Sequence, residues 1–89
     1  MTKNEKIDQL YRIISELDSP EACEMLFADL CTNKEVEKMA ERLYAATLLL
    51  EGKTYNQVIE QTEISSATLS RVSRCVQYGT GYSTILKKK

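Results

Sequence analysis

The sequence has no histidine, and among its 89 residues it has one proline, three glycines and three cysteines. A structural zinc site or a Cys/His nucleophile would therefore lack its usual ligands, since the cysteines form no C-x-x-C pair either. There is no glycine-rich phosphate loop, and the carboxylates are scattered rather than gathered into an acid–base pair. We expect a protein that is not an enzyme and that holds neither a metal nor a cofactor.

The cysteines are odd in number: Cys23, Cys31 and Cys75. The sequence shows no signal peptide and no apolar run long enough to span a bilayer, so we expect a cytoplasmic protein without contact to a membrane. In a reduced compartment an unpaired cysteine behaves as a small hydrophobic residue. We therefore expect buried, free thiols.

Charge is divided unevenly along the chain. Residues 1–52 hold six Lys/Arg and eleven Asp/Glu, a net charge of −5, whereas residues 53–89 hold six and two, a net charge of +4. A polyanion responds to the local patch rather than to the net charge, so the C-terminal part is the candidate for contact with phosphate. A chain this short also buries little of its surface, and a partner subunit is expected to complete its core.

Apolar residues recur at helical spacing through most of the chain, and no strand pattern competes with them. The spacing predicts helices over about 5–17, 20–31 and 33–51. Ser19 caps the second, a capping box of Thr32 and Glu35 opens the third, and Gly52 ends it as a C-terminal cap. Thr54 and Gln57 form a second capping box, which begins a fourth helix. The third helix is apolar over more than one stripe, so we expect it to be central.

Residues 54–76 have the pattern of two short helices joined by a tight turn. Apolar residues fall at the spacings that close such a corner, namely Val58, Ile59, Ile64, Leu69 and Val72. The second helix also has an exposed polar stripe that includes Ser70 and Arg74. A DNA-reading helix-turn-helix needs both faces, because its first helix braces across the phosphate backbone while its second lies in the major groove. A plain structural helical corner has the same periodicity and remains an alternative.

Residues 30–79 resemble the Trp repressor superfamily, and the string ISSATLSRVSRCVQYG resembles its uncharacterised YerC/YecD branch. The resemblance implies an all-α, Trp repressor-like helical domain that forms an intertwined homodimer, in which helices of both subunits share one core. It also implies binding of double-stranded operator DNA. We therefore predict a single domain over 1–89, with dimerisation helices in 1–52, a helix-turn-helix in 53–77 and a loose C-terminal tail in 78–89.

The resemblance also implies which residues contact DNA. The positions carried over are Lys53, Thr54 and Gln57 near the first motif helix, and Ser65, Ser66, Ala67, Thr68, Ser70 and Arg71 on the recognition helix. Hydroxyls and free backbone donors at a helix N-terminus can bind phosphate, and Ala67 is small enough to approach a thymine methyl. Arg74 joins the set from its place on the polar stripe, and either arginine suits phosphate or guanine.

At the family's effector site the likeness is incomplete. Thr32, Arg42 and Arg71 correspond to residues that hold tryptophan in the repressor, but Val72 replaces a glycine and Cys75 replaces a serine. The site is then bulkier and loses a polar contact, so we do not expect tryptophan to bind. The alternative is that Thr32 only caps its helix and that Arg42 is a surface or ion-pair residue.

The sequence thus predicts a sequence-specific DNA-binding transcription regulator, acting as a repressor and as a homodimer. The runner-up is a helical dimer that uses the same corner to bind a protein of the transcription machinery. A further departure from the family lies in the turn, where Glu63 takes the position usually given to glycine. Because a left-handed backbone disfavours glutamate, we expect a different turn here.

Overall fold

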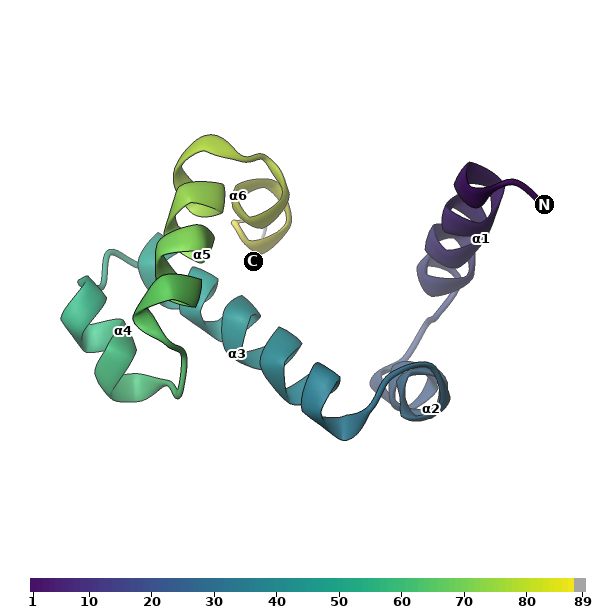
Figure 1. Cartoon of the computed structure of the whole chain (residues 1–89), viewed down its shortest axis with the longest axis horizontal. Helices are drawn as coiled ribbons and strands as arrows, with labels where there is room; N and C mark the ends of the chain where they lie inside the picture. The colour runs from purple at the N-terminus through teal and green to yellow at the C-terminus, as the bar shows by residue number, and fades with distance from the viewer. Residues whose placement is uncertain (88–89) are drawn as a thin grey trace. The chain divides into compact units, whose positions relative to one another are not determined.

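The computed structural model describes residues 1–87, which fold into helices without any strand (Figure 1). The helices are α1 (Lys3–Ser15), α2 (Pro20–Leu30), α3 (Asn33–Leu50), α4 (Tyr55–Gln61), α5 (Ser66–Tyr78) and α6 (Gly81–Leu86). The all-α prediction is confirmed. The chain divides into two compact units, Met1–Val36 and Glu37–Lys89.

In the N-terminal unit α1 begins two residues before the predicted start. Thr2 Oγ accepts a hydrogen bond from the Glu5 backbone N–H (3.2 Å), and Glu5 Oε1 accepts one from the Thr2 N–H (2.7 Å). This capping box was not among those predicted from the sequence. It holds the pKa of Glu5 below its ordinary value, because the carboxylate accepts the Thr2 backbone N–H. The Ser19 cap of α2 is confirmed by a 3.0 Å bond from the Ala22 N–H.

No residue of α1 or α2 is buried within one chain. Several of their large apolar side chains are exposed, and Met25 is 74% exposed. The expectation of buried thiols is wrong for the same reason: Cys23 is exposed and Cys31 half-buried, because these helices enclose no core. All three cysteines are free, and Cys75 in α5 is half-buried as well.

The core of the C-terminal unit is one buried cluster. Its members are Ala45, Ala46, Leu48, Val58, Ile64, Leu69 and Val72. It therefore joins the C-terminal half of α3 to α4, to the following turn and to α5, as the apolar spacing predicted. Ile59 is the exception, because it is 39% exposed on the outer side of α4.

Gly52 ends α3 with a left-handed backbone, at a φ of 90°. The Gly52 N–H donates to the Leu49 carbonyl (3.0 Å), and the Lys53 N–H donates to the Leu48 carbonyl (3.1 Å). These two bonds are those of a Schellman motif, which satisfies carbonyls that the helix end would leave free. The predicted glycine cap is thus confirmed, and it sets the direction in which the chain leaves α3 for α4.

The predicted loose tail is corrected for residues 81–86, which form α6. Tyr82 and Leu86 of this helix pack against the buried cluster. The helix turns back after Gly79, where an added Cβ would lie 2.7 Å from the Cys75 carbonyl oxygen. Two apolar residues one turn apart, among turn-forming residues, are too weak a pattern to predict a helix. The remaining tail residues 88–89 lie outside the described part of the chain.

Candidate nucleic-acid interface

The start of α4 is fixed by the predicted capping box. Thr54 Oγ accepts a hydrogen bond from the Gln57 backbone N–H (3.2 Å), and Gln57 Oε1 accepts one from the Thr54 N–H (2.8 Å). Both residues are exposed, as is Lys53 before them. Because the amide oxygen of Gln57 is engaged in the cap, its NH₂ group is the part that remains to donate outward.

The turn between α4 and α5 is held by side chains. Thr62 Oγ donates to the Val58 carbonyl at 2.8 Å, and the Glu63 backbone N–H donates to Glu41 Oε1 of α3 at 3.2 Å. Among residues 1–87 no residue other than glycine has a positive φ, so Glu63 does not adopt the left-handed backbone. The chain therefore reverses here without the conformation that would favour glycine.

The first turn of α5 carries its own cap. Ser65 Oγ accepts a hydrogen bond from the Thr68 backbone N–H (3.2 Å) and also donates to Thr68 Oγ1 (3.0 Å). The first residues of a helix have backbone N–H groups without a partner inside the helix, and here these belong to Ser66 and Ala67, which are both exposed. They form a small donor site at the positive end of the helix dipole.

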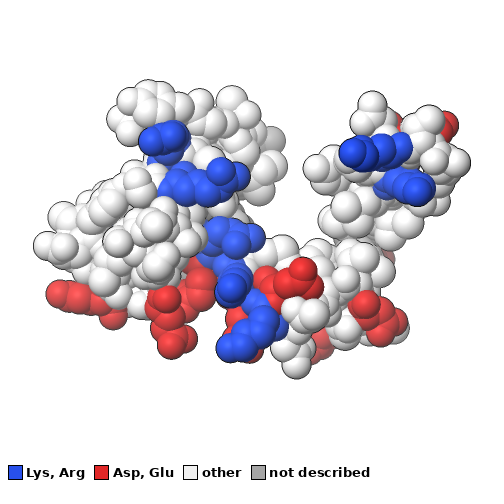
Figure 2. Space-filling view, in the orientation of Figure 1, with Lys and Arg blue, Asp and Glu red and all other residues white. Residues whose placement is uncertain are grey.

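The remainder of α5 is divided between a buried and an exposed side. Leu69 is fully buried and Val72 is 2% exposed, whereas Ser70, Arg71 and Arg74 are exposed. Figure 2 shows basic side chains gathered over α5 and α3 on one face of the C-terminal unit, with acidic side chains at its α4 end. All ten residues predicted to contact DNA belong to this unit, and only Thr68 among them is half-buried.

The three candidate effector residues do not all fall in one unit. Thr32 lies in the N-terminal unit, whereas Arg42 and Arg71 lie in the C-terminal unit. Thr32 Oγ accepts a hydrogen bond from the Glu35 N–H (3.1 Å), and Glu35 Oε1 accepts one from the Thr32 N–H (2.8 Å), so the capping box is confirmed. The pKa of Glu35 is lowered because its carboxylate accepts the Thr32 backbone N–H.

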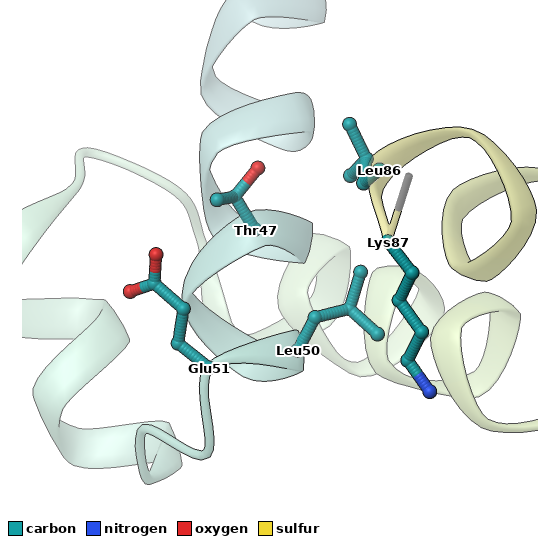
Figure 3. A pocket seen from close by; sticks show the side chains of 5 residues that line it. All are labelled: Thr47, Leu50, Glu51, Leu86 and Lys87. Atoms are coloured by element: carbon teal, nitrogen blue, oxygen red, sulfur yellow. The ribbon is translucent and has the colours of Figure 1, made fainter. Parts of the chain in front are cut away.

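A small cavity of about 360 Å³ lies between α3 and α6. It is lined by Thr47, Leu50, Glu51, Leu86 and Lys87. Figure 3 shows the Glu51 and Lys87 side chains pointing away from one another, so they do not form a paired charge site. Within residues 1–87 there is also no group of three potential metal ligands, and no helix is long and apolar enough to cross a membrane.

Glu41 also shapes this surface, and the sequence pattern did not predict it. Glu41 bonds to the turn before α5 across 22 positions of sequence. No local pattern links two residues so far apart, and only the packing of α3 against the corner brings them together.

The sequence of this chain matches the model of a known protein family. The family model described as Trp repressor protein matches residues 5–89. The chain belongs to the Trp repressor family.

Relatives of the Trp repressor family agree with this assignment. The uncharacterised protein YerC of Bacillus subtilis (strain 168) is 43% identical over 77 residues, which are 86% of this chain and 74% of YerC. The crystal structure of a protein from Staphylococcus aureus, provisionally assigned as a Trp repressor, is 34% identical and superposes with a TM-score of 0.88 over 99% of this chain and 94% of that one. A TrpR-like protein from Eubacterium eligens ATCC 27750 is 33% identical, with a TM-score of 0.91 over 97% and 90%. The Trp repressor-like fold is thus shown.

Proposed function

We propose that this chain is a sequence-specific DNA-binding transcription regulator that acts as a repressor. In this proposal α4 and α5 are a helix-turn-helix, and α5 is the recognition helix in the major groove. The observation that carries it is the division of α5, which buries Leu69 and Val72 while Arg71 and Arg74 stay exposed. Membership in the Trp repressor family supports the same function.

The proposed contacts follow from the polar groups that each residue can offer to DNA. Lys53, Thr54 and Gln57 lie at the start of α4, where they would contact the phosphate backbone. The backbone donors of Ser66 and Ala67 would bind a phosphate at the start of α5, while Ser65 and Thr68 chiefly hold the helix cap. Further along α5, the exposed residues Ser70, Arg71 and Arg74 would reach base edges or phosphates.

We further propose that the regulator is a homodimer formed chiefly by residues 1–52. The N-terminal unit buries no residue of α1 or α2 within one chain, although both helices carry large apolar side chains. A second copy that covers these side chains would supply the missing core. Two α5 helices related by a two-fold axis would then read a roughly symmetric DNA site.

Tryptophan is not part of this proposal. Val72 is buried in the core of the C-terminal unit, where its side chain packs within the cluster that joins α3 to α5. A larger residue at the position of the repressor's glycine leaves less room for an indole beside Arg42 and Arg71. Thr32 has the cap of α3 as its role.

A protein partner is the second candidate function, and the surface of α4 favours it. Tyr55 is 45% exposed and Ile59 39% exposed on this helix. Large apolar side chains of this kind serve as anchors in protein interfaces. The same dimer would then bind a component of the transcription machinery through the corner.

Selection of bound sequences from a pool of random duplexes tests the two functions. A DNA regulator should enrich a site with two symmetric halves, and its affinity should fall steeply with salt because counterions are released on binding. A pool without enrichment, together with salt-insensitive binding of a protein, would instead support the second candidate.

A further inference from the structure

Figure 2 shows basic side chains over α3, a helix outside the proposed helix-turn-helix, as well as over α5. Within the C-terminal unit, the only Lys and Arg residues of α3 are Lys38 and Arg42, and those of α5 are Arg71 and Arg74. Figure 2 shows basic side chains over both helices on the same face. We call these four residues the basic row.

The helical spacing of α3 explains why the basic row continues from α5 onto α3. Lys38, Arg42 and Ala46 follow one another at intervals of four residues, and each step moves only about 40° around a helix. Ala46 is fully buried in the cluster that includes Leu69 and Val72 of α5. The stripe of α3 that packs on α5 is therefore apolar in its C-terminal half and cationic in its N-terminal half.

Acidic neighbours do not interrupt the row. Glu37 and Glu41 lie about 100° and 60° around α3 from Lys38 on one side, and Glu35 lies about 60° from it on the other side, where its carboxylate caps the helix. Glu41 Oε1 accepts the Glu63 backbone N–H, which directs this carboxylate toward the α4–α5 turn. Lys38 is exposed and Arg42 half-buried, so Lys38 is accessible to a ligand.

The row also lacks the apolar anchors of a protein-binding surface. The exposed apolar residues near it in sequence, Val36, Leu43 and Tyr44, lie about 160°, 140° and 120° around the helix from Lys38. A surface of lysine and arginine without an apolar centre suits a polyanion better than a folded protein partner.

We propose that Lys38 and Arg42 bind the sugar–phosphate backbone of DNA beside the segment that α5 contacts. The inference rests on the proposed function, and it enlarges the DNA-contacting surface from the α4–α5 corner onto α3. Contacts of this kind position the protein without reading bases. Lys38 and Arg42 therefore raise the affinity for every sequence equally.

A purely structural role is the competing explanation. The aliphatic stems of lysine and arginine can cover apolar surface while their charged ends stay in water. In that case replacing Lys38 would change the stability of the C-terminal unit and leave DNA binding untouched. Stability and DNA affinity are therefore both measured on each variant.

The experiment compares Lys38→Gln with Lys6→Gln. Both variants lose one positive charge from an exposed lysine, but Lys6 lies on α1 in the N-terminal unit. Dissociation constants are measured between about 50 and 300 mM salt, on the selected duplex and on a duplex of random sequence. Phosphate ethylation interference then maps the contacts, and melting curves report folding.

Lys38→Gln should weaken binding to both duplexes by the same factor, about threefold to tenfold, and should lower the salt slope by about two units, one for each subunit of the proposed homodimer. Ethylation of phosphates that flank the selected bases should no longer reduce binding by Lys38→Gln. The same ethylation should still reduce binding by the wild type and by Lys6→Gln. Arg42→Gln should add to the effect, whereas Arg42→Lys should largely retain binding. The base preference in a repeated selection should not change.

This inference would be overturned if Lys38→Gln and Lys6→Gln had equal affinities and equal salt slopes while binding by the wild type fell steeply with salt. The proposed function would then still stand. Wild-type protein that binds neither duplex would overturn both. A lower melting temperature of Lys38→Gln with unchanged ethylation interference would also overturn the inference in favour of the structural role.

Discussion

Glu41 Oε1 lies 3.2 Å from the Glu63 backbone nitrogen and accepts its hydrogen bond, although 22 positions separate the two residues. The bond connects α3 to the turn that precedes α5. It supplies a partner for a turn N–H that regular secondary structure does not satisfy. The angle at which α5 leaves the turn thus depends on a residue of another helix.

Replacing Glu41 by Ala should loosen this turn. We expect a decrease of about 0.5–1.5 kcal/mol in the free energy of unfolding, the usual contribution of one such hydrogen bond. Urea denaturation followed by circular dichroism measures it. Glu41→Gln is the matched variant, because its amide oxygen can still accept the N–H, and it should lose less. Equal losses in the two variants would show that the hydrogen bond is not the cause.

Replacing Arg71 or Arg74 by Ala should weaken DNA binding while helicity and assembly stay intact, because both side chains are exposed. A residue that contacts only phosphate should lower the salt slope by about one unit per subunit and affect all sequences alike, whereas a residue that reads guanine should relax the preference at one position of each half-site. Fluorescence anisotropy on matched and mismatched duplexes separates the two cases. Unchanged affinity in both variants would refute α5 as the recognition helix.

The protein should sediment as a dimer at micromolar concentration, and Met25→Asp should dissociate it. Each subunit would lose a buried side chain that contributes about 1.5–3 kcal/mol, so the dissociation constant should rise at least about 100-fold. Gln61→Asp, which adds the same charge to exposed α4, is the control. Leu48→Asp is a test of the core instead, because Leu48 is only 4% exposed within one chain. A folded wild-type monomer in sedimentation velocity would contradict the dimer.

Tryptophan should not change the affinity for DNA. The side chain of Val72 fills space that the indole of tryptophan would need, and overpacking of this kind costs about 1–3 kcal/mol of binding free energy. The serine hydroxyl that is missing at Cys75 costs about as much again. At about 1.4 kcal/mol per tenfold, these losses together weaken binding by roughly one to four orders of magnitude. Titration calorimetry measures the affinity for tryptophan, and the double variant Val72→Gly with Cys75→Ser should restore some of this affinity. Micromolar binding by the unchanged protein would contradict this account.

The sequence predicted those features that depend on neighbouring residues. The capping boxes of Thr32 with Glu35 and of Thr54 with Gln57 follow from a three-residue spacing, and the structure contains both. The buried side of α5 followed from helical periodicity in the same way. Features that depend on tertiary packing were missed, as the bond between Glu41 and Glu63 shows.

The errors have a related cause. Ile59 adjoins buried Val58, and its exposure is decided by how α4 is rotated against the cluster rather than by its hydrophobicity. In α6 the sequence suggested turns, but contacts of Tyr82 and Leu86 with the cluster accompany a helix there. Which residues of α5 touch DNA, and which bases they meet, depends on a ligand that lies outside the chain.

In the proposed homodimer, the absence of residues buried within one chain in α1 and α2 makes the folding of these two helices depend on the concentration of the protein. Helices of this length are marginal in water on their own, so a newly made chain would hold a folded C-terminal unit and a frayed N-terminal one until it meets another copy. Proteases would cleave first among residues 1–30 of such an unassembled chain. Scarce subunits would then be degraded faster than abundant ones, and the amount of regulator in a cell would respond more than proportionally to its rate of synthesis.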